Sequence, residues 1–194
     1  MVPVTEPTEL PPLRPWSYPE VTRLLLTFDG SAIRLLAGLV GSPVQMVVDA
    51  QQPVAPQAVP PVVREALAGE GGLAPLVLQR SRLITPQGVT VSGCHAYLPA
   101  RQAASLLPPS GTPLLHHLAQ QQSLLACRPV SFAPRHWPYA GERRWSVGRD
   151  YLVDCRGGGR IWVSEQFSPD RIPAAAAPGL GAAPDLTPPA GDRA

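Results

Sequence analysis

The stretch LVLQRSRLITPQGVTVSGCHAYLP, from Leu76 to Pro99, decides the fold of this 194-residue chain. Residues 76–85 and residues 89–98 are two β-like runs, and the Pro-Gln-Gly between them has the chemistry of a tight turn. Two such runs joined by a short turn predict a β-hairpin. Because a hairpin pairs its strands antiparallel, the sheet that contains it is expected to be mainly antiparallel.

Further strands are predicted on both sides of this hairpin. A short β-rich run occupies residues 43–49, and three more candidates follow at residues 124–132, 144–155 and 160–167. The last two are joined by Arg-Gly-Gly-Gly at residues 156–159, which predicts a second hairpin. A glycine run in a hairpin is not at the start of a helix, so a phosphate-cradling loop and a dinucleotide-binding fold are not expected.

Helix signals separate these strands. One helix is expected to start at Pro19 and to end at Asp29-Gly30, and a second is expected to be capped by Ser31 and ended by Gly41. Three shorter helices are predicted at residues 62–68, 101–107 and 113–121. The predicted fold is one α+β domain, with a mainly antiparallel sheet of about six strands and helices packed on one side.

Composition places both ends of the chain outside this domain. The chain has 26 Pro and 17 Gly, roughly 22% of all residues against an ordinary usage of about 12%. Residues 1–15 are punctuated by proline, and residues 173–194 form an Ala/Pro/Gly tail without an aromatic residue. Neither end can bury enough apolar surface to offset its chain entropy, so we expect two disordered ends around a domain at residues 16–172.

Charge and composition exclude several classes of function. All 16 basic residues are arginine, which excludes lysine amine chemistry, and a formal charge of +2 is too mild for a dedicated nucleic-acid binder. Three distant cysteines and four histidines show no metal-ligand spacing, and the cysteine usage favours a reducing compartment. No apolar run approaches the ~20 residues of a bilayer span, and the start fits no secretory signal. We expect a cytoplasmic protein without a metal or a membrane partner.

One carboxylate lies in an apolar row. Alternation along residues 160–167 places Glu165 on the same face as its neighbours Val163 and Phe167. A carboxylate there is costly unless it is paired, hydrogen-bonded or protonated. Two interpretations stay open, a structural ion pair with an arginine and a group that acts on a ligand.

Two arginines lie on the first strand of the hairpin. Alternation places Arg80 and Arg82 on one side of that strand together with Leu78 and Ile84. A guanidinium is always charged, and its planar fork of donors suits a ligand carboxylate. Solvated surface arginines are the plainer interpretation, and a carboxylate-binding pair is the alternative.

Four segments that carry the predicted elements occur in a fixed order along the chain. They are LLLTFDGSAIRLLAGLVGSPVQMVV from residue 24, the hairpin stretch, GTPLLHHL from residue 111, and VGRDYLVDCRGGGRIWVSEQFSP from residue 147. In this order and spacing they resemble the chorismate lyase (chorismate pyruvate-lyase) family. The resemblance runs from Leu24 to Pro169.

This resemblance implies an activity and a set of site residues. Members of the family convert chorismate to 4-hydroxybenzoate and pyruvate without a cofactor, a carbon-oxygen lyase reaction whose product would feed quinone biosynthesis. The family's carboxylate-binding arginine falls on Arg80 and its active-site glutamate on Glu165, which together would be the catalytic residues. Backbone amides at Leu114 and Ser31 would also contact the substrate. A monomer is implied as well.

A second hypothesis comes from another functional class. The effector domains of GntR-type transcription regulators are similar in fold, so the chain could be a non-catalytic domain that binds a small aromatic acid or another effector. Such regulators carry a helix-turn-helix domain ahead of the sensor, and the residues before Pro19 are too few for one, so the lyase hypothesis comes first. Geometry separates the two, because catalysis needs Arg80 and Glu165 to face each other across a ring-sized gap.

Overall fold

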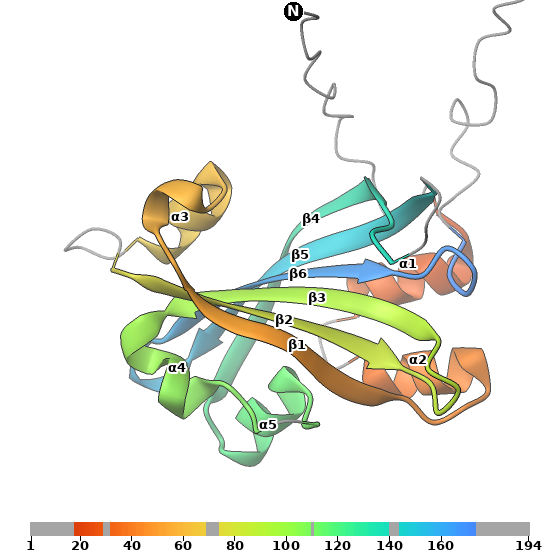
Figure 1. Cartoon of the computed structure of the whole chain (residues 1–194), viewed down its shortest axis with the longest axis horizontal. Helices are drawn as coiled ribbons and strands as arrows, with labels where there is room; N and C mark the ends of the chain where they lie inside the picture. Colours follow the sequence, from red (N-terminus) through yellow and green to blue (C-terminus); the bar gives the residue numbers. More distant parts are fainter. Residues whose placement is uncertain (1–17, 29–31, 69–73, 110, 140–143, 174–194) are drawn as a thin grey trace, which may run out of the picture.

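One antiparallel sheet forms the centre of the protein. The computed structural model describes residues 18–28, 32–68, 74–109, 111–139 and 144–173. Within these residues the sheet has six strands in the order β1-β2-β3-β6-β5-β4 (Figure 1). The strands are β1 (Gln45–Val54), β2 (Leu76–Ile84), β3 (Thr90–Pro99), β4 (Leu124–His136), β5 (Trp145–Cys155) and β6 (Arg160–Phe167).

Every neighbouring pair of strands is antiparallel, which confirms the predicted sheet. Both predicted hairpins, β2–β3 and β5–β6, are present. The second one turns at Arg156–Gly158, where Gly157 and Gly158 have φ angles of +74° and +76° that other residues rarely adopt. The last strand, β6, lies between β3 and β5, so the two hairpins are joined through it at the centre of the sheet.

Two strands run further than the sequence pattern predicts. β1 continues through Pro53 to Val54, and β4 continues through Pro134 to His136. Both are edge strands, each paired on one side. Proline has no backbone N–H to donate. One side of an edge strand faces no other strand and needs no donor, so these strands can continue through their prolines.

The helices begin where the sequence signals place them. They are α1 (Glu20–Thr27), α2 (Ile33–Val40), α3 (Pro61–Leu67), α4 (Ala100–Leu106) and α5 (Leu114–Gln120). α2 ends as predicted at Gly41, whose φ is +64°. Ser31, the predicted cap of α2, lies outside the described residues, and Ala32 precedes the first turn.

Four of these helices cover one face of the sheet, which we call the inner face. α1 and α2 pack over one end of it and α4 and α5 over the other, so the predicted gathering of helices on one side holds for these four. α3 is the exception and lies on the opposite, outer face (Figure 1). The reason is that the sheet is apolar on its outer side as well at this end, where Leu76 and Trp162 are buried against Val63 of α3.

The inner face carries two separate apolar clusters. One lies under α4 and α5 and includes Leu98 and Val163, and the other lies under α1 and α2 and includes Phe167. A polar row crosses the sheet between them. Its members are paired in register on β2, β3, β6 and β5, and they are Ser81, Cys94, Glu165 and Arg149. We call these four residues the inner polar row.

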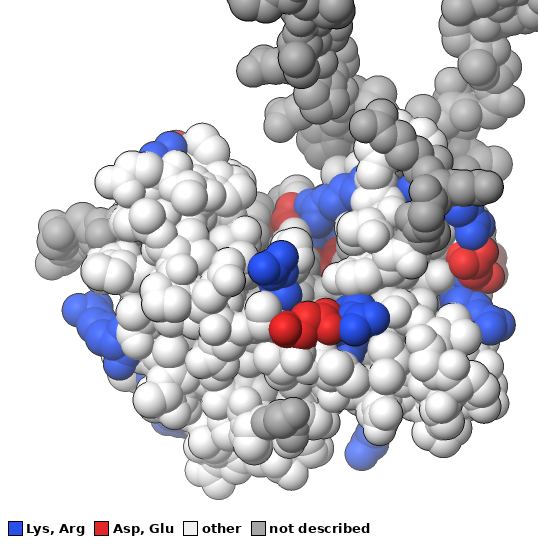
Figure 2. Space-filling model, viewed as in Figure 1, with Lys and Arg blue, Asp and Glu red and all other residues white. Residues whose placement is uncertain are grey.

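The opposite face also carries charged side chains. Figure 2 shows arginines and carboxylates side by side near the middle of the view, to the right of α3. Of the predicted disordered ends, residues 1–15 and 173–194, all but Pro173 lie outside the described residues. In the described ranges, no helix has the length and apolarity needed to cross a bilayer.

Candidate functional site

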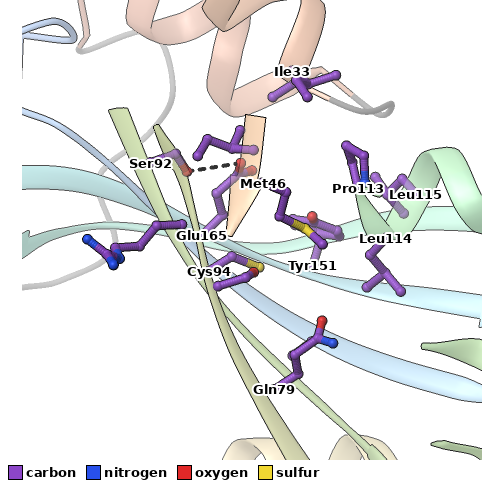
Figure 3. Close-up of a pocket in the computed structure, with 15 residues that line it drawn as sticks. Ile33, Met46, Gln79, Ser92, Cys94, Pro113, Leu114, Leu115, Tyr151 and Glu165 are labelled. Atoms are coloured by element: carbon purple, nitrogen blue, oxygen red, sulfur yellow. Dashed lines mark hydrogen bonds between the residues drawn. The ribbon is translucent and has the colours of Figure 1, made fainter. Parts of the chain in front are cut away.

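A cavity opens over the inner polar row, between α2 and α5 (Figure 3). Its volume is about 60 Å³, and the space is about 550 Å³ when the open solvent at its mouth is counted. Polar groups gather at its base, which the strands of the sheet form. They are Gln79, Ser81, Ser92, Cys94, Tyr151 and Glu165, and the apolar lining includes Ile33, Met46, Pro113, Leu114 and Leu115.

Glu165 is held in the cavity wall by a buried ion pair with Arg149. Its Oε2 atom accepts from Arg149 Nε at 2.9 Å and from Nη2 at 2.8 Å, and its Oε1 atom accepts from the Ser92 hydroxyl at 3.3 Å. Glu165 is 6% exposed and Arg149 is 3% exposed. The structural ion pair considered for Glu165 is therefore present, and its partner is Arg149.

Arg149 also ties this pair to helix α1. Its Nη1 atom donates to the backbone carbonyl of Leu25 at 2.8 Å and to that of Phe28, at the end of α1 where helix carbonyls lack partners. Its guanidinium lies 4.9 Å from the centre of the Tyr151 ring, within cation–π range. The guanidinium of Arg149 is therefore occupied by protein partners, and its role is to hold β5, β6 and α1 together.

Two polar side chains at the base of the cavity have no protein partner among the described residues. The side-chain amide of Gln79 is 2% exposed and makes no hydrogen bond to any described residue. The Tyr151 hydroxyl likewise makes none. Burial, then the charge of Glu165, raises the pKa of Tyr151 well above its ordinary value, so the hydroxyl stays neutral. Figure 3 shows both side chains at the cavity with Cys94 and Glu165.

Cys94 contributes a thiol rather than a thiolate to this site. Burial raises its pKa to about 12, and the nearby Glu165 carboxylate acts in the same direction. A nucleophilic cysteine needs a lowered pKa, so Cys94 acts in the cavity wall as a small neutral group.

The predicted site residues do not all meet in this cavity. Glu165 and Leu114 line it together. Arg80 does not: it lies on the outer face, exposed, on the side of β2 opposite to Gln79 and Ser81. The expected arrangement of Arg80 and Glu165 across one ring-sized gap is therefore absent, and the prediction for Ser31 lies outside the described residues.

The other arginine of β2, Arg82, is also unavailable to the cavity. It contributes to the rim, but its guanidinium binds Asp49, with Nε to Oδ1 and Oδ2 at 2.9 Å and Nη2 to Oδ1 at 2.6 Å. It also lies 5.7 Å from the centre of the Tyr139 ring. Among the described residues that line the cavity, no arginine is left without a carboxylate.

Sequence reasoning missed Arg149 and Gln79 as site residues. A signal for each was present in the strand alternation. Arg149 is spaced by two from the apolar residues Val147 and Tyr151, and Gln79 is spaced by two from Val77, so both belong to inward-facing rows. No group of three His, Cys, Asp or Glu side chains among the described residues is placed to hold a metal ion.

Comparison with solved structures identifies the fold. PhnF from Mycobacterium smegmatis matches with a TM-score of 0.58 and 14% identity over 75% of this chain and 67% of PhnF. The effector domain of PhnF matches with a TM-score of 0.55 and 15% identity, over 73% of this chain and 90% of that domain.

A ligand-binding domain from Bordetella bronchiseptica, described as part of a GntR-family transcriptional regulator, matches with a TM-score of 0.52 and 10% identity, over 67% of this chain and 87% of that domain. At the level of sequence, no family model and no curated protein matches. The chain therefore has the chorismate lyase-like fold, in the form seen in the effector domains of GntR-type regulators.

Proposed function

We propose that the chain is a ligand-binding domain that holds an uncharged, hydroxylated, ring-sized molecule in the inner cavity. The observation that carries this proposal is the side-chain amide of Gln79, buried at the base of the cavity without a described partner. The polar atoms of this amide are not among the fully buried atoms that lack a partner, so they are open to the cavity, where a ligand can bond to them in place of water. The similarity of the fold to effector and ligand-binding domains supports the same class of function.

The charge balance of the cavity favours a neutral ligand. Glu165 and Arg149 compensate each other, and Arg82 at the rim is compensated by Asp49. A ligand carboxylate placed at the base would meet no spare cation among the described residues that line the cavity. Burying an uncompensated carboxylate is strongly unfavourable, so the cavity selects against it.

The free hydrogen-bonding positions define the polar end of the ligand. Glu165 Oε1 has the Ser92 hydroxyl at 3.3 Å and can accept from one more donor, such as a ligand hydroxyl. The Gln79 amide offers both a donor and an acceptor. A ligand that donates to Glu165 and accepts from Gln79 would satisfy both groups.

The size of the cavity sets the position of the ring. A cavity that binds benzene in another protein measures about 150 Å³, and this one measures about 60 Å³, too little for a whole ring. The polar end of the ligand would therefore occupy the base. The ring would extend toward the mouth, and Ile33 and Leu114 of the apolar lining would supply contacts.

Chorismate lyase activity is the second candidate function. The placement of Glu165 and Leu114 in one cavity favours it, because the family resemblance assigns both to the active site. Chorismate carries two carboxylates, however, and the arginine that the resemblance assigns to one of them is Arg80, which lies on the other face of the sheet. For this reason binding without turnover is the function that the site supports best.

Calorimetric titration with two matched probes tests the proposed function. Methyl 4-hydroxybenzoate is uncharged, whereas 4-hydroxybenzoate differs from it only by an ionised carboxylate at pH 7. We expect the ester to bind at least tenfold more tightly to the inner cavity. Gln79→Leu should remove this binding, and Gln120→Leu, on the exposed side of α5, should not. Equal binding of the ester by wild type and Gln79→Leu would contradict the proposal.

Incubation with chorismate tests the second candidate. The purified protein is expected to release no 4-hydroxybenzoate and pyruvate beyond the rate measured for Glu165→Gln. Equimolar release of both products by the wild type, abolished in Glu165→Gln, would establish the lyase and overturn the binding-only function.

A further inference from the structure

A second cavity lies on the outer face of the sheet, on the side opposite to the inner cavity. Its volume is about 170 Å³, larger than the 60 Å³ of the inner cavity. By the same benchmark of about 150 Å³ it is large enough for a single ring. Its lining is mixed polar and aromatic, and it consists of Gly93, His95, Arg135, Pro138, Tyr139, Ser164 and Gln166. We call it the outer cavity.

Two glycines in one row of the sheet make room for its walls. Gly93 on β3 and Gly148 on β5 are both paired with Gln166 on β6. A Cβ on Gly93 would come within 2.3 Å of the Tyr139 ring, and a Cβ on Gly148 would come within 3.2 Å of the Arg135 side chain. The Tyr139 ring and the Arg135 side chain thus lie directly on the sheet backbone, where any larger residue would displace them.

A row of polar residues, paired across four strands, lies next to the Tyr139 ring and the Arg135 side chain. Arg80, His95, Ser164 and Asp150 are paired successively across β2, β3, β6 and β5. Asp150 accepts from Arg135 Nη2 at 2.5 Å and from Ser164 Oγ at 2.6 Å, so the charge of Arg135 is compensated. We call the four paired residues the outer polar row.

Arg80 is the uncompensated cation of this row. Its side chain is exposed, and it makes no ion pair or side-chain hydrogen bond with a described residue. Directly paired residues on one face have their Cβ atoms about 5 Å apart, so the guanidinium can reach the space over His95. Arg80 does not itself line the outer cavity, but after burial its charge contributes to the lowered pKa of His95, which does.

We propose that the outer cavity binds a small planar carboxylate, with its carboxylate paired to Arg80 and its ring against Tyr139. A guanidinium binds a carboxylate through two parallel hydrogen bonds, and Arg80 has its donors available. The Tyr139 ring and Pro138 provide an apolar wall for a flat ligand. This site is independent of the proposed function, because it lies on the other face of the sheet and uses different side chains.

His95 provides a local reporter for this site. Burial, then the charges of Arg80 and Arg135, lowers the pKa of His95. The other charged groups of the neighbourhood are Asp150, paired with Arg135, and Asp49, paired with Arg82. A carboxylate bound beside Arg80 adds a negative charge and should raise the pKa of His95.

NMR titration of the histidine ring signals with benzoate, at constant ionic strength, tests the proposal. We expect saturable shifts at His95, assigned through His95→Gln, and none at His116 or His117 on α5. Arg80→Gln should weaken benzoate binding at least tenfold. The matched control Arg101→Gln removes an exposed arginine of α4, which packs on the inner face, and should leave the affinity unchanged.

A second variant and a second probe complete the test. Gly93→Ala changes no charge, but its Cβ would push the Tyr139 ring aside, so benzoate binding should fall while the protein stays folded. Inorganic phosphate should shift His95 more weakly than benzoate, because it has no ring to place on Tyr139. Shifts of His95 that persist in Arg80→Gln, or phosphate binding as tight as that of benzoate, would overturn the proposal. Benzoate should bind Gln79→Leu as tightly as it binds the wild type, because Gln79 lines the inner cavity and not the outer one.

Discussion

The two faces of the sheet carry polar rows built from successive residues of the same four strands. Each residue of the inner polar row adjoins one of the outer polar row in the chain, as Arg149 adjoins Asp150 and Glu165 adjoins Ser164. The inner row is covered by helices, and its two charges compensate each other. The outer row is only partly exposed: Asp150 is buried and paired with Arg135, whereas Arg80 is exposed and has no carboxylate partner among the described residues. A shift of one residue along a strand thus separates a neutral cavity from a positive one.

A buried ion pair and an exposed ion pair contribute differently to the free energy of unfolding. Removing one partner from a buried ion pair leaves a charge in a low-dielectric interior, whereas an exposed pair is screened by water and salt. The inner row should therefore determine stability. On the outer face, the exposed Arg80 should affect the charge preference for a ligand with little effect on folding.

The largest expected effect is that of Arg149→Met. The substitution leaves Glu165 buried without its cation and leaves the carbonyls of Leu25 and Phe28 without their donor. Urea denaturation should show a loss of about 3–5 kcal/mol in the free energy of unfolding. Arg128→Met, which breaks an exposed pair with Asp154, should cost less than about 1 kcal/mol. Similar losses in the two variants would contradict the contrast between the faces.

The next largest effect on stability is expected from adding a Cβ to one of the two glycines beside the outer cavity, Gly148 and Gly93. A Cβ on Gly148 would lie 2.8 Å from the backbone oxygen of Glu165, whereas the atoms nearest to a Cβ on Gly93 belong to the Tyr139 side chain. Gly148→Ala should therefore lower the free energy of unfolding by about 1–3 kcal/mol. Gly93→Ala should cost less, because a side chain can move where a backbone cannot. The reverse order in thermal unfolding would show that the Tyr139 ring is fixed by the fold.

A smaller effect of opposite sign is expected for Gln79→Leu. Replacing this cavity-lining amide by an apolar side chain of similar size removes no hydrogen bond to a described residue and adds apolar surface to a buried position. The free energy of unfolding should stay the same or rise by up to about 1 kcal/mol, while binding of the uncharged ester is lost. A clear loss of stability would mean that the amide has a structural partner, and it would remove the main support for the ligand.

The smallest effect on folding is expected for Arg80→Gln. An exposed side chain away from the core should change the free energy of unfolding by no more than about 0.5 kcal/mol. Its removal should nevertheless raise the pKa of His95, because a nearby positive charge disfavours the protonated imidazole. An NMR pH titration of the His95 ring would measure this. An unchanged pKa would place Arg80 too far away to act on the outer cavity.

The strand and helix pattern was largely predictable from the sequence. The hairpin at Leu76–Ile84 and Thr90–Pro99 follows from two β-like runs and a turn, and these features are local. The position of α3 was not predictable in this way. It depends on which face of the sheet is left apolar, and this is decided by Leu152 and Trp162 from strands far along the chain.

The site was predictable in part, and the error lies on β2. The row that contains Glu165 was found because Val163 and Phe167 are unambiguously apolar. On β2 the apolar residues Leu78 and Ile84 suggested that Arg80 faces inward, yet the inward row is the one that contains Gln79. A strand with apolar residues on both sides gives no clear alternation, so its register against Glu165 was needed to choose the face.

The most direct measurement follows the Gln79 side-chain amide and the His95 ring by NMR in two samples of the same protein. Methyl 4-hydroxybenzoate is added to one sample and benzoate to the other, with Gln79→Leu and His95→Gln used to assign the signals. The ester should shift the Gln79 amide and leave His95 in place, and benzoate should do the reverse. Ester that leaves the Gln79 amide unmoved, or two probes that move the same signals, would contradict a neutral inner cavity and a positive outer one.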